Sequence, residues 1–241
     1  MSEDRPRIVV TVAAPVEAVW DAMRNKDKIR HWHGWEYEGT EGGAGLEEEI
    51  DLIYFTQVTA NEESGILTLG NGDEFVVEAV EGGSRITLTR APYGANPEWD
   101  AYYDDVTEGW ITFLHQLRFA MESHPGEPRR TLFYSGAGAC SPIVELGIET
   151  RPADTPYDLD LIGEPAKGQV WFTSEHQVGL TVDGWGNGLL VLSHTPPSEK
   201  KPDGASMAIL TTYGDVDRDS LDQRWKTWWE SRYPTPLDLG G

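Results

Sequence analysis

The sequence predicts an α+β fold in which an antiparallel meander is followed by a long helix, with the arrangement present twice. Short strand-like runs separated by turns rich in glycine, asparagine and aspartate fill residues 48–89, and short turns of this kind favour an antiparallel meander. A long amphipathic run follows and ends near His124-Pro125. The tripeptide Gly-Asn-Gly at Gly70–Gly72 recurs at Gly186–Gly188, which indicates an internal repeat.

The opening elements are a strand and a helix. Arg7–Val12 is β-branched and apolar, which is typical of a strand. Pro15 suits the first turn of a helix, and apolar residues then recur every three or four positions. A short helix or turn that carries Trp32 and Trp35 is expected to end at Gly34. The first helical face consists of Val16, Val19, Trp20 and Met23.

A meander and a closing helix complete the first copy. After a loop at 91–101, Asp105 and Glu108 have the spacing of a capping box, and a long helix should follow. Its apolar face comprises Trp110, Phe113, Leu114, Leu117 and Met121. The predicted strands are Glu48–Thr59, Gly65–Leu69, Glu74–Val80 and Ser84–Thr89.

Two motifs flank the predicted meander, "APVEAVW" at Ala14–Trp20 and "GWITFLHQL" at Gly109–Leu117. With these motifs the first half, over about residues 7–124, resembles the START-like superfamily (SRPBCC, Bet v 1-like), whose helix-grip fold has an antiparallel sheet wrapped around a long C-terminal helix. Within the superfamily, the C-terminal domain of the activator of Hsp90 ATPase is the branch that the motifs resemble. The resemblance implies a helix-grip fold but says little about function, because this fold hosts many functions.

The second half reads as a degenerate second copy. Phe55-Thr56 recurs as Phe172-Thr173 at an offset of 117 residues, beside the repeated Gly-Asn-Gly. Thr131–Tyr134 is expected to be the opening strand, and Ser141-Pro142 the start of a helix. The closing helix should present Leu221, Trp225, Trp228 and Trp229 on one face. We therefore predict domains at 1–124 and 125–241, the latter a degenerate START-like copy or an unrelated α+β extension.

Charge and composition narrow the choice of partners. The 241 residues include 41 acidic and 19 basic side chains, a net charge of −22, which disfavours nucleic acid and anionic membrane surfaces. No apolar stretch reaches the length of a membrane span, and no signal peptide is apparent, so we expect a cytoplasmic protein without membrane insertion. The single cysteine, Cys140, cannot form an internal disulfide, and a small apolar role is the simplest reading of it.

The resemblance implies a cavity between the sheet and the long helix of the first copy. A concave aromatic pocket suits a small hydrophobic molecule, although the same side chains could simply fill a core. The ligand would be unknown, and the second copy should have a smaller or filled cavity. The residues expected to line the pocket are Trp20, Trp32, Trp35, Tyr54, Phe75, Trp110, Phe113, Leu114 and Leu117.

The stretch "RHWHGWEYEG" raises the question of a metal or catalytic site. His31 and His33 are two residues apart and do not share a helical face, so we predict no metal site and place both at the pocket mouth, partly solvated. No nucleophile elbow, dinucleotide fingerprint or phosphate loop is present, and we expect no cofactor. "GAGAC" at Gly136–Cys140 reads as a turn.

Three functions compete. The leading hypothesis is a non-enzymatic binder of a small hydrophobic molecule. The alternative is an enzyme resembling polyketide cyclases and dehydratases, which would need a converging acid–base pair in the same cavity; Tyr54, Tyr102 or Tyr103 could then act as general acids. A chaperone interaction module is the third.

Overall fold

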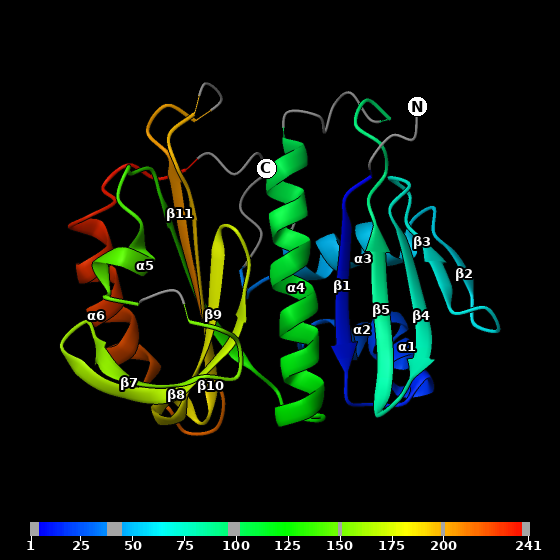
Figure 1. Ribbon diagram of the computed structural model, residues 1–241, viewed down its shortest axis with the longest axis horizontal. Helices are drawn as coiled ribbons and strands as arrows, with labels where there is room; N and C mark the ends of the chain where they lie inside the picture. Colours follow the sequence, from blue (N-terminus) through cyan, green and yellow to red (C-terminus); the bar gives the residue numbers. More distant parts are fainter. Residues whose placement is uncertain (1–4, 38–44, 96–101, 149–150, 199–200, 238–241) are drawn as a thin grey trace. The chain divides into compact units, whose positions relative to one another are not determined.

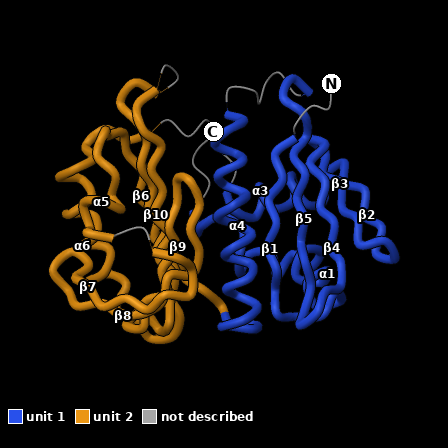
Figure 2. Tube along the Cα trace, viewed as in Figure 1, with its two compact units in different colours: residues 1–127 blue, residues 128–241 orange. Residues whose placement is uncertain are grey.

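The computed structural model divides the chain into two compact units, residues 1–127 and 128–241 (Figure 2). It describes residues 5–37, 45–95, 102–148, 151–198 and 201–237. Among these residues, no helix is both long and apolar enough to cross a membrane. The predicted loop at 91–101 lies partly outside the described residues.

The first unit is a five-stranded antiparallel sheet with a long closing helix (Figure 1). The strand order is β1-β5-β4-β3-β2, so the first strand pairs with the last, with Val10 opposite Ile86. The elements are β1 (Arg7–Val12), α1 (Val16–Arg24), α2 (Lys26–Ile29), α3 (Leu46–Phe55), β2 (Thr59–Asn61), β3 (Ile66–Thr68), β4 (Glu74–Val80), β5 (Gly83–Thr89) and α4 (Tyr103–Ser123).

The core of the first unit lies between the sheet and α4. Alternate residues of the strands are buried, as the period-two geometry of a strand requires, and the apolar stripe of α4 joins them in one cluster. From the sheet come Val10, Val12, Phe75, Val77, Ile86 and Leu88, and from α4 come Trp110, Leu114 and Leu117.

The second unit repeats this plan with six strands. The strand order is β6-β11-β10-β9-β8-β7, and again the first strand pairs with the last. The elements are β6 (Arg130–Gly136), α5 (Pro142–Glu145), β7 (Pro156–Leu161), β8 (Glu164–Thr173), β9 (Gln177–Val182), the 3-10 helix η2 (Asp183–Trp185), β10 (Gly188–Thr195), β11 (Ala205–Thr212) and α6 (Arg218–Glu230). The fold is therefore α+β of the helix-grip type, duplicated along the chain.

The two Gly-Asn-Gly segments occupy corresponding places. Gly70–Gly72 connects β3 to β4, and Gly186–Gly188 connects η2 to β10, in each case before the last two strands of the sheet. The Phe-Thr pairing does not correspond, because Phe55 ends a helix whereas Phe172 lies in a strand.

Two predictions about the elements of the first unit are wrong. The predicted strand Glu48–Thr59 is mostly the helix α3, in which Leu46, Ile50 and Tyr54 are buried at intervals of four residues. Three glutamates in its first turn favour a helix N-terminus, and the Glu48 carboxylate accepts the Gly45 N–H at 3.0 Å. The long helix begins at Tyr103, so Asp105 does not act as its cap.

Candidate functional site

Seven of the nine predicted lining residues are buried in the core of the first unit. Trp35 and Phe113 are only half-buried. The rings contact one another edge to face, with centroids 5.6 Å apart for Trp32 and Tyr54 and 5.2 Å apart for Phe75 and Trp110. The buried members are Trp20, Trp32, Tyr54, Phe75, Trp110, Leu114 and Leu117.

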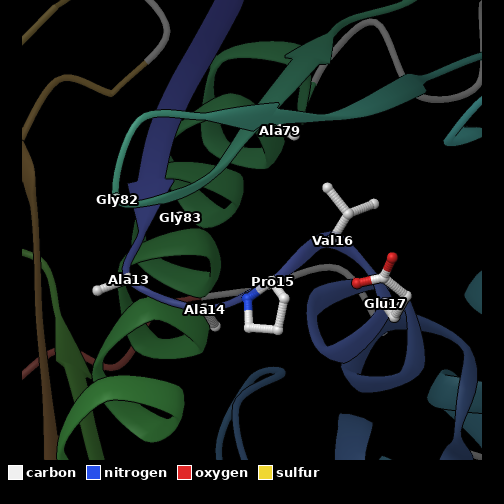
Figure 3. Close-up of a pocket in the computed structure, with 8 residues that line it drawn as sticks. All are labelled: Ala13, Ala14, Pro15, Val16, Glu17, Ala79, Gly82 and Gly83. Carbon is white, nitrogen blue, oxygen red and sulfur yellow. The ribbon is translucent and has the colours of Figure 1, made fainter.

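The hollow shown in Figure 3 lies elsewhere in this unit. It measures about 410 Å³ and is open to solvent, and none of the nine predicted lining residues borders it. Most of its lining residues are small and come from the β1–α1 connection and the β4–β5 turn. The start of α1 adds one carboxylate, that of Glu17. These residues give no acid–base pair. The contacting rings elsewhere in this unit, which we call the aromatic layer, are those of Trp32, Tyr54, Phe75, Trp110 and Phe113.

His33 is the centre of that layer, and its predicted place at a solvated mouth is wrong. The side chain is fully buried. The turn after α2 continues to this residue through a bond from the His33 N–H to the Ile29 carbonyl at 2.8 Å. The imidazole lies 4.6 Å from the Phe113 ring and 5.2 Å from the Tyr54 ring, between centroids. His31 remains half-buried, and its Nδ1 is 2.7 Å from the Glu127 carbonyl.

A polar chain runs through the aromatic layer. Tyr54 Oη is 2.9 Å from His33 Nδ1, and His33 Nε2 is 3.3 Å from Glu49 Oε1. Because a carboxylate can only accept, Nε2 carries the proton toward Glu49, and in the neutral imidazole Nδ1 then accepts the Tyr54 hydroxyl. The Tyr37 hydroxyl donates to the other oxygen of Glu49, whose side chain is 32% exposed. The chain thus leads from the core toward the surface.

The protonation states follow from these surroundings. Burial raises the pKa of Tyr54 well above 10, and the negative charge of Glu49 raises it further, so the phenol stays neutral. Burial also raises the pKa of Glu49, but its interactions with His33 and the Tyr37 hydroxyl outweigh this effect and bring the pKa below 4.5. Glu49 is therefore a carboxylate at neutral pH, suited to orient His33 and to stabilise positive charge on it.

A second buried network fixes the start of α4. Asp73 is fully buried and accepts from Arg90 Nε at 3.0 Å, from Trp110 Nε1 at 3.1 Å and from the Ala91 N–H at 2.7 Å. Arg90 also donates to Thr107 Oγ1 at 2.6 Å. These bonds tie the β3–β4 turn and the end of β5 to the helix that closes the aromatic layer.

The other two tyrosines that the sequence offered as general acids lie outside the polar chain. Tyr103 donates its hydroxyl to the Ala91 carbonyl at 2.7 Å, and Tyr102 is exposed. Within the described residues, no three histidine, cysteine, aspartate or glutamate side chains are placed to share a metal ion. Sequence reasoning missed Glu49, whose signal was the helical spacing of Leu46, Ile50 and Tyr54.

Comparisons with known proteins give no family assignment. No protein-family model matches this sequence. None of the curated proteins matches it either.

Solved structures match over most of the chain at low identity. DynU16, from the dynemicin biosynthetic locus, is 17% identical over 94% of this chain and 95% of its own, with a TM-score of 0.35. The di-domain ARO/CYC BexL from the BE-7585A pathway is 9% identical over 93% and 94%, with a TM-score of 0.37. The di-domain ARO/CYC StfQ from the steffimycin pathway is 8% identical over 90% and 87%, with a TM-score of 0.35.

At such scores the matches carry no argument about the superfamily, the ligand or the reaction of this chain. The START-like resemblance and its Hsp90-activator branch stay predictions. Any functional reading therefore depends on the side chains described above.

Proposed function

We propose that the first unit binds a small, mainly apolar molecule beside His33 and that the Tyr54–His33–Glu49 chain moves a proton on it. The observation that carries the proposal is a fully buried imidazole hydrogen-bonded to a phenol and a carboxylate and surrounded by aromatic rings. A cavity-type enzyme needs such converging acid–base groups, whereas a carrier does not.

In this arrangement the Glu49 carboxylate orients the His33 imidazole, which acts as a general base. Glu49 holds the Nε2–H of His33, so the lone pair of Nδ1 faces the Tyr54 hydroxyl. A carbon acid beside Tyr54 gives its proton to the phenolic oxygen while the hydroxyl proton passes to His33. The imidazolium is then stabilised by Glu49. Returning the proton to the enolate oxygen gives the enol, and returning it to another carbon of an extended enolate gives an isomerised ketone. No oxidant, metal or cofactor is needed for this balance.

The surroundings define the class of molecule. Trp35, Tyr37 and Phe113 are half-buried, and Phe113 contacts the imidazole directly, so the accessible side of the site is aromatic. Rings of this kind bind flat apolar molecules with little loss of side-chain entropy. An aromatic ketone or a polyketide-like chain with acidic C–H groups fits these requirements.

A carrier without catalysis is the second candidate. The specific observation in its favour is that burial raises the pKa of Tyr54, which keeps the phenol protonated. In a carrier, the polar chain would only orient a ligand oxygen and hold α3 against the turn after α2.

Deuterium exchange separates the two candidates. The C1 protons of 2-tetralone, an aryl-fused ketone, are followed by NMR in D₂O with and without the protein. The proposal predicts accelerated exchange that falls about 100-fold or more in His33→Gln, since a positioned general base contributes about 10²- to 10⁴-fold. The matched control is His31→Gln, which removes a half-buried imidazole two residues away and should keep the rate.

Folding must be monitored because His33 is buried. Thermal midpoints of both variants are measured, and Tyr54→Phe, which keeps the ring and removes only the hydroxyl, serves as a second variant. Binding of 2-tetralone without acceleration would leave the carrier function, and an absence of binding would contradict both.

A further inference from the structure

The second unit carries two histidines that lie opposite each other on neighbouring strands. The pairing of β9 with β10 sets Gln177 opposite Ser193, and it continues through a bond from the His194 N–H to the His176 carbonyl at 2.9 Å. Residues that face each other in this way point to the same side of a sheet, with Cβ atoms about 4.5–5.5 Å apart. Both histidines are half-buried, so their rings are neighbours that an ion in solution can reach.

A serine on the next strand holds the ring of His194. Ser206 on β11 is the partner of His194 in the ladder, and its Oγ is 2.9 Å from His194 Nδ1. Ser206 is fully buried, and its hydroxyl is also hydrogen-bonded to the hydroxyl of Tyr233. Tyr233 in turn donates to the Cys140 carbonyl at 2.9 Å. These groups form one chain of hydrogen bonds from His194 to the main chain.

The glycine-rich segment Gly136–Cys140, which the sequence predicts to be a turn, makes room for this chain. Gly136 is the partner of Ser206 on β6, and a Cβ on Gly136 would lie 2.5 Å from Tyr233 Cβ. A Cβ on Gly138 would lie 2.7 Å from Tyr233 Cδ1. Side chains at these two positions would therefore displace Tyr233 from Ser206 and from the Cys140 carbonyl.

The directions of these bonds determine the tautomer of His194. A carbonyl oxygen only accepts, so the Tyr233 proton points to Cys140. The Tyr233 oxygen then accepts the Ser206 proton, and the Ser206 oxygen accepts a proton from His194 Nδ1. In the neutral ring, a proton on Nδ1 leaves the lone pair on Nε2. A neutral imidazole nitrogen with its lone pair is the commonest protein ligand of metal ions.

The bond from His194 to Ser206 is of the kind that supports a metal ligand. Histidines that bind metals commonly donate their other ring N–H to an oxygen, which fixes the orientation of the ring. His176 supplies a second imidazole beside it, and the net charge of −22 attracts cations to the chain. Imidazole nitrogens favour Zn²⁺, Cu²⁺ and Ni²⁺ over Mg²⁺ and Ca²⁺.

We propose that the second unit binds a divalent transition-metal ion such as Zn²⁺ through His194 Nε2 and the imidazole of His176. Ser206 and Tyr233 position the His194 ring, and water completes the coordination, since the described residues offer no cluster of three metal-ligating side chains. The site is separate from the one proposed in the first unit and does not depend on it. It departs from the sequence-based expectation of no metal and no cofactor, because these residues come together only in the folded sheet.

Zinc titrations of the ¹⁵N-labelled full chain test the site at neutral pH. The histidine rings are followed by long-range ¹H–¹⁵N NMR, and each is assigned by its loss in a histidine-to-glutamine variant. We expect His194 to carry its proton on Nδ1 in the free protein. Zn²⁺ should shift the nitrogens of His176 and His194 together, whereas Mg²⁺ at the same concentration should shift neither. Each histidine should lose its response when the other is replaced by glutamine.

The affinity for Zn²⁺ gives the second readout. Ser206→Ala should lower it about 10- to 100-fold, the usual effect of removing such a partner of a metal ligand, and should weaken the preference of His194 for the Nδ1 proton. The matched control is Ser193→Ala, which removes a hydroxyl from the other face of β10 and should keep the affinity. Circular dichroism confirms that each variant is folded. Rings that do not respond to Zn²⁺, an equal response to Mg²⁺, or a His194 shift that survives in folded His176→Gln would overturn the proposal.

Discussion

Replacing Asp73 by alanine should destabilise the first unit strongly, because it removes one partner of a fully buried ion pair. Arg90 is 5% exposed, and without Asp73 its charge would lie in the core uncompensated, while the Trp110 and Ala91 N–H groups would lose their acceptor. Breaking a buried pair in this way costs about 3–5 kcal/mol. With an m-value of about 2 kcal/mol per molar urea, the midpoint should fall by about 2 M.

The assay is urea unfolding followed by tryptophan fluorescence, with hydrogen exchange to show that the loss is confined to residues 1–127. The matched control is Glu78→Ala, which breaks the pair between Glu78 on β4 and Arg85 on β5, whose side chains are 52% and 46% exposed. That change should cost at most about 1 kcal/mol. Adding Arg90→Met to Asp73→Ala should restore part of the stability by removing the unpaired charge. A double variant less stable than Asp73→Ala, or equal effects of Asp73→Ala and Glu78→Ala, would refute the reasoning.

Three further changes test other parts of the structure. Trp110→Ala should cost about 3–5 kcal/mol by opening a cavity beside His33, and an unchanged denaturation midpoint would contradict its burial. Gly138→Ala should destabilise the second unit by about 1–3 kcal/mol in a thermal melt, since its new Cβ would lie 2.7 Å from Tyr233 Cδ1, whereas Gly184→Ala meets nothing within 4 Å and should be neutral. The pKa of Glu49 is lowered on folding, so its contribution to stability is present above pH 4.5 and lost as the pH falls through the folded-state value; Glu49→Gln should flatten that part of the stability–pH curve.

Local patterns predicted the elements whose period is unambiguous. The strand at Arg7–Val12 and the amphipathic stripe of Trp110, Leu114 and Leu117 are confirmed, since each pattern fits only one type of structure. Residues 48–55 are ambiguous, because Ile50, Ile53 and Tyr54 fit both a strand composition and a helical face.

The candidate site could not be predicted in full, because long-range contacts decide it. His33 is buried by α3, which supplies Glu49 and Tyr54 16 and 21 residues later in the chain, and by the Phe113 ring of α4. Asp73 and Arg90 are 17 residues apart, and no local spacing links them. The sequence analysis grouped Tyr54 with the tryptophans of the first copy, and most of these side chains are buried in one core, but it placed His33 at a partly solvated pocket mouth.

The most direct test of the central claim is long-range ¹H–¹⁵N NMR of the histidine side chains in the presence of 2-tetralone. The account predicts that free His33 shows an Nε2-protonated ring with Nδ1 as acceptor, and that the ketone shifts the His33 nitrogens and leaves those of His31 in place. His31 thus serves as a control within the same molecule. A His33 spectrum that does not respond to saturating ketone, or a response confined to His31, would contradict a site built on Tyr54, His33 and Glu49.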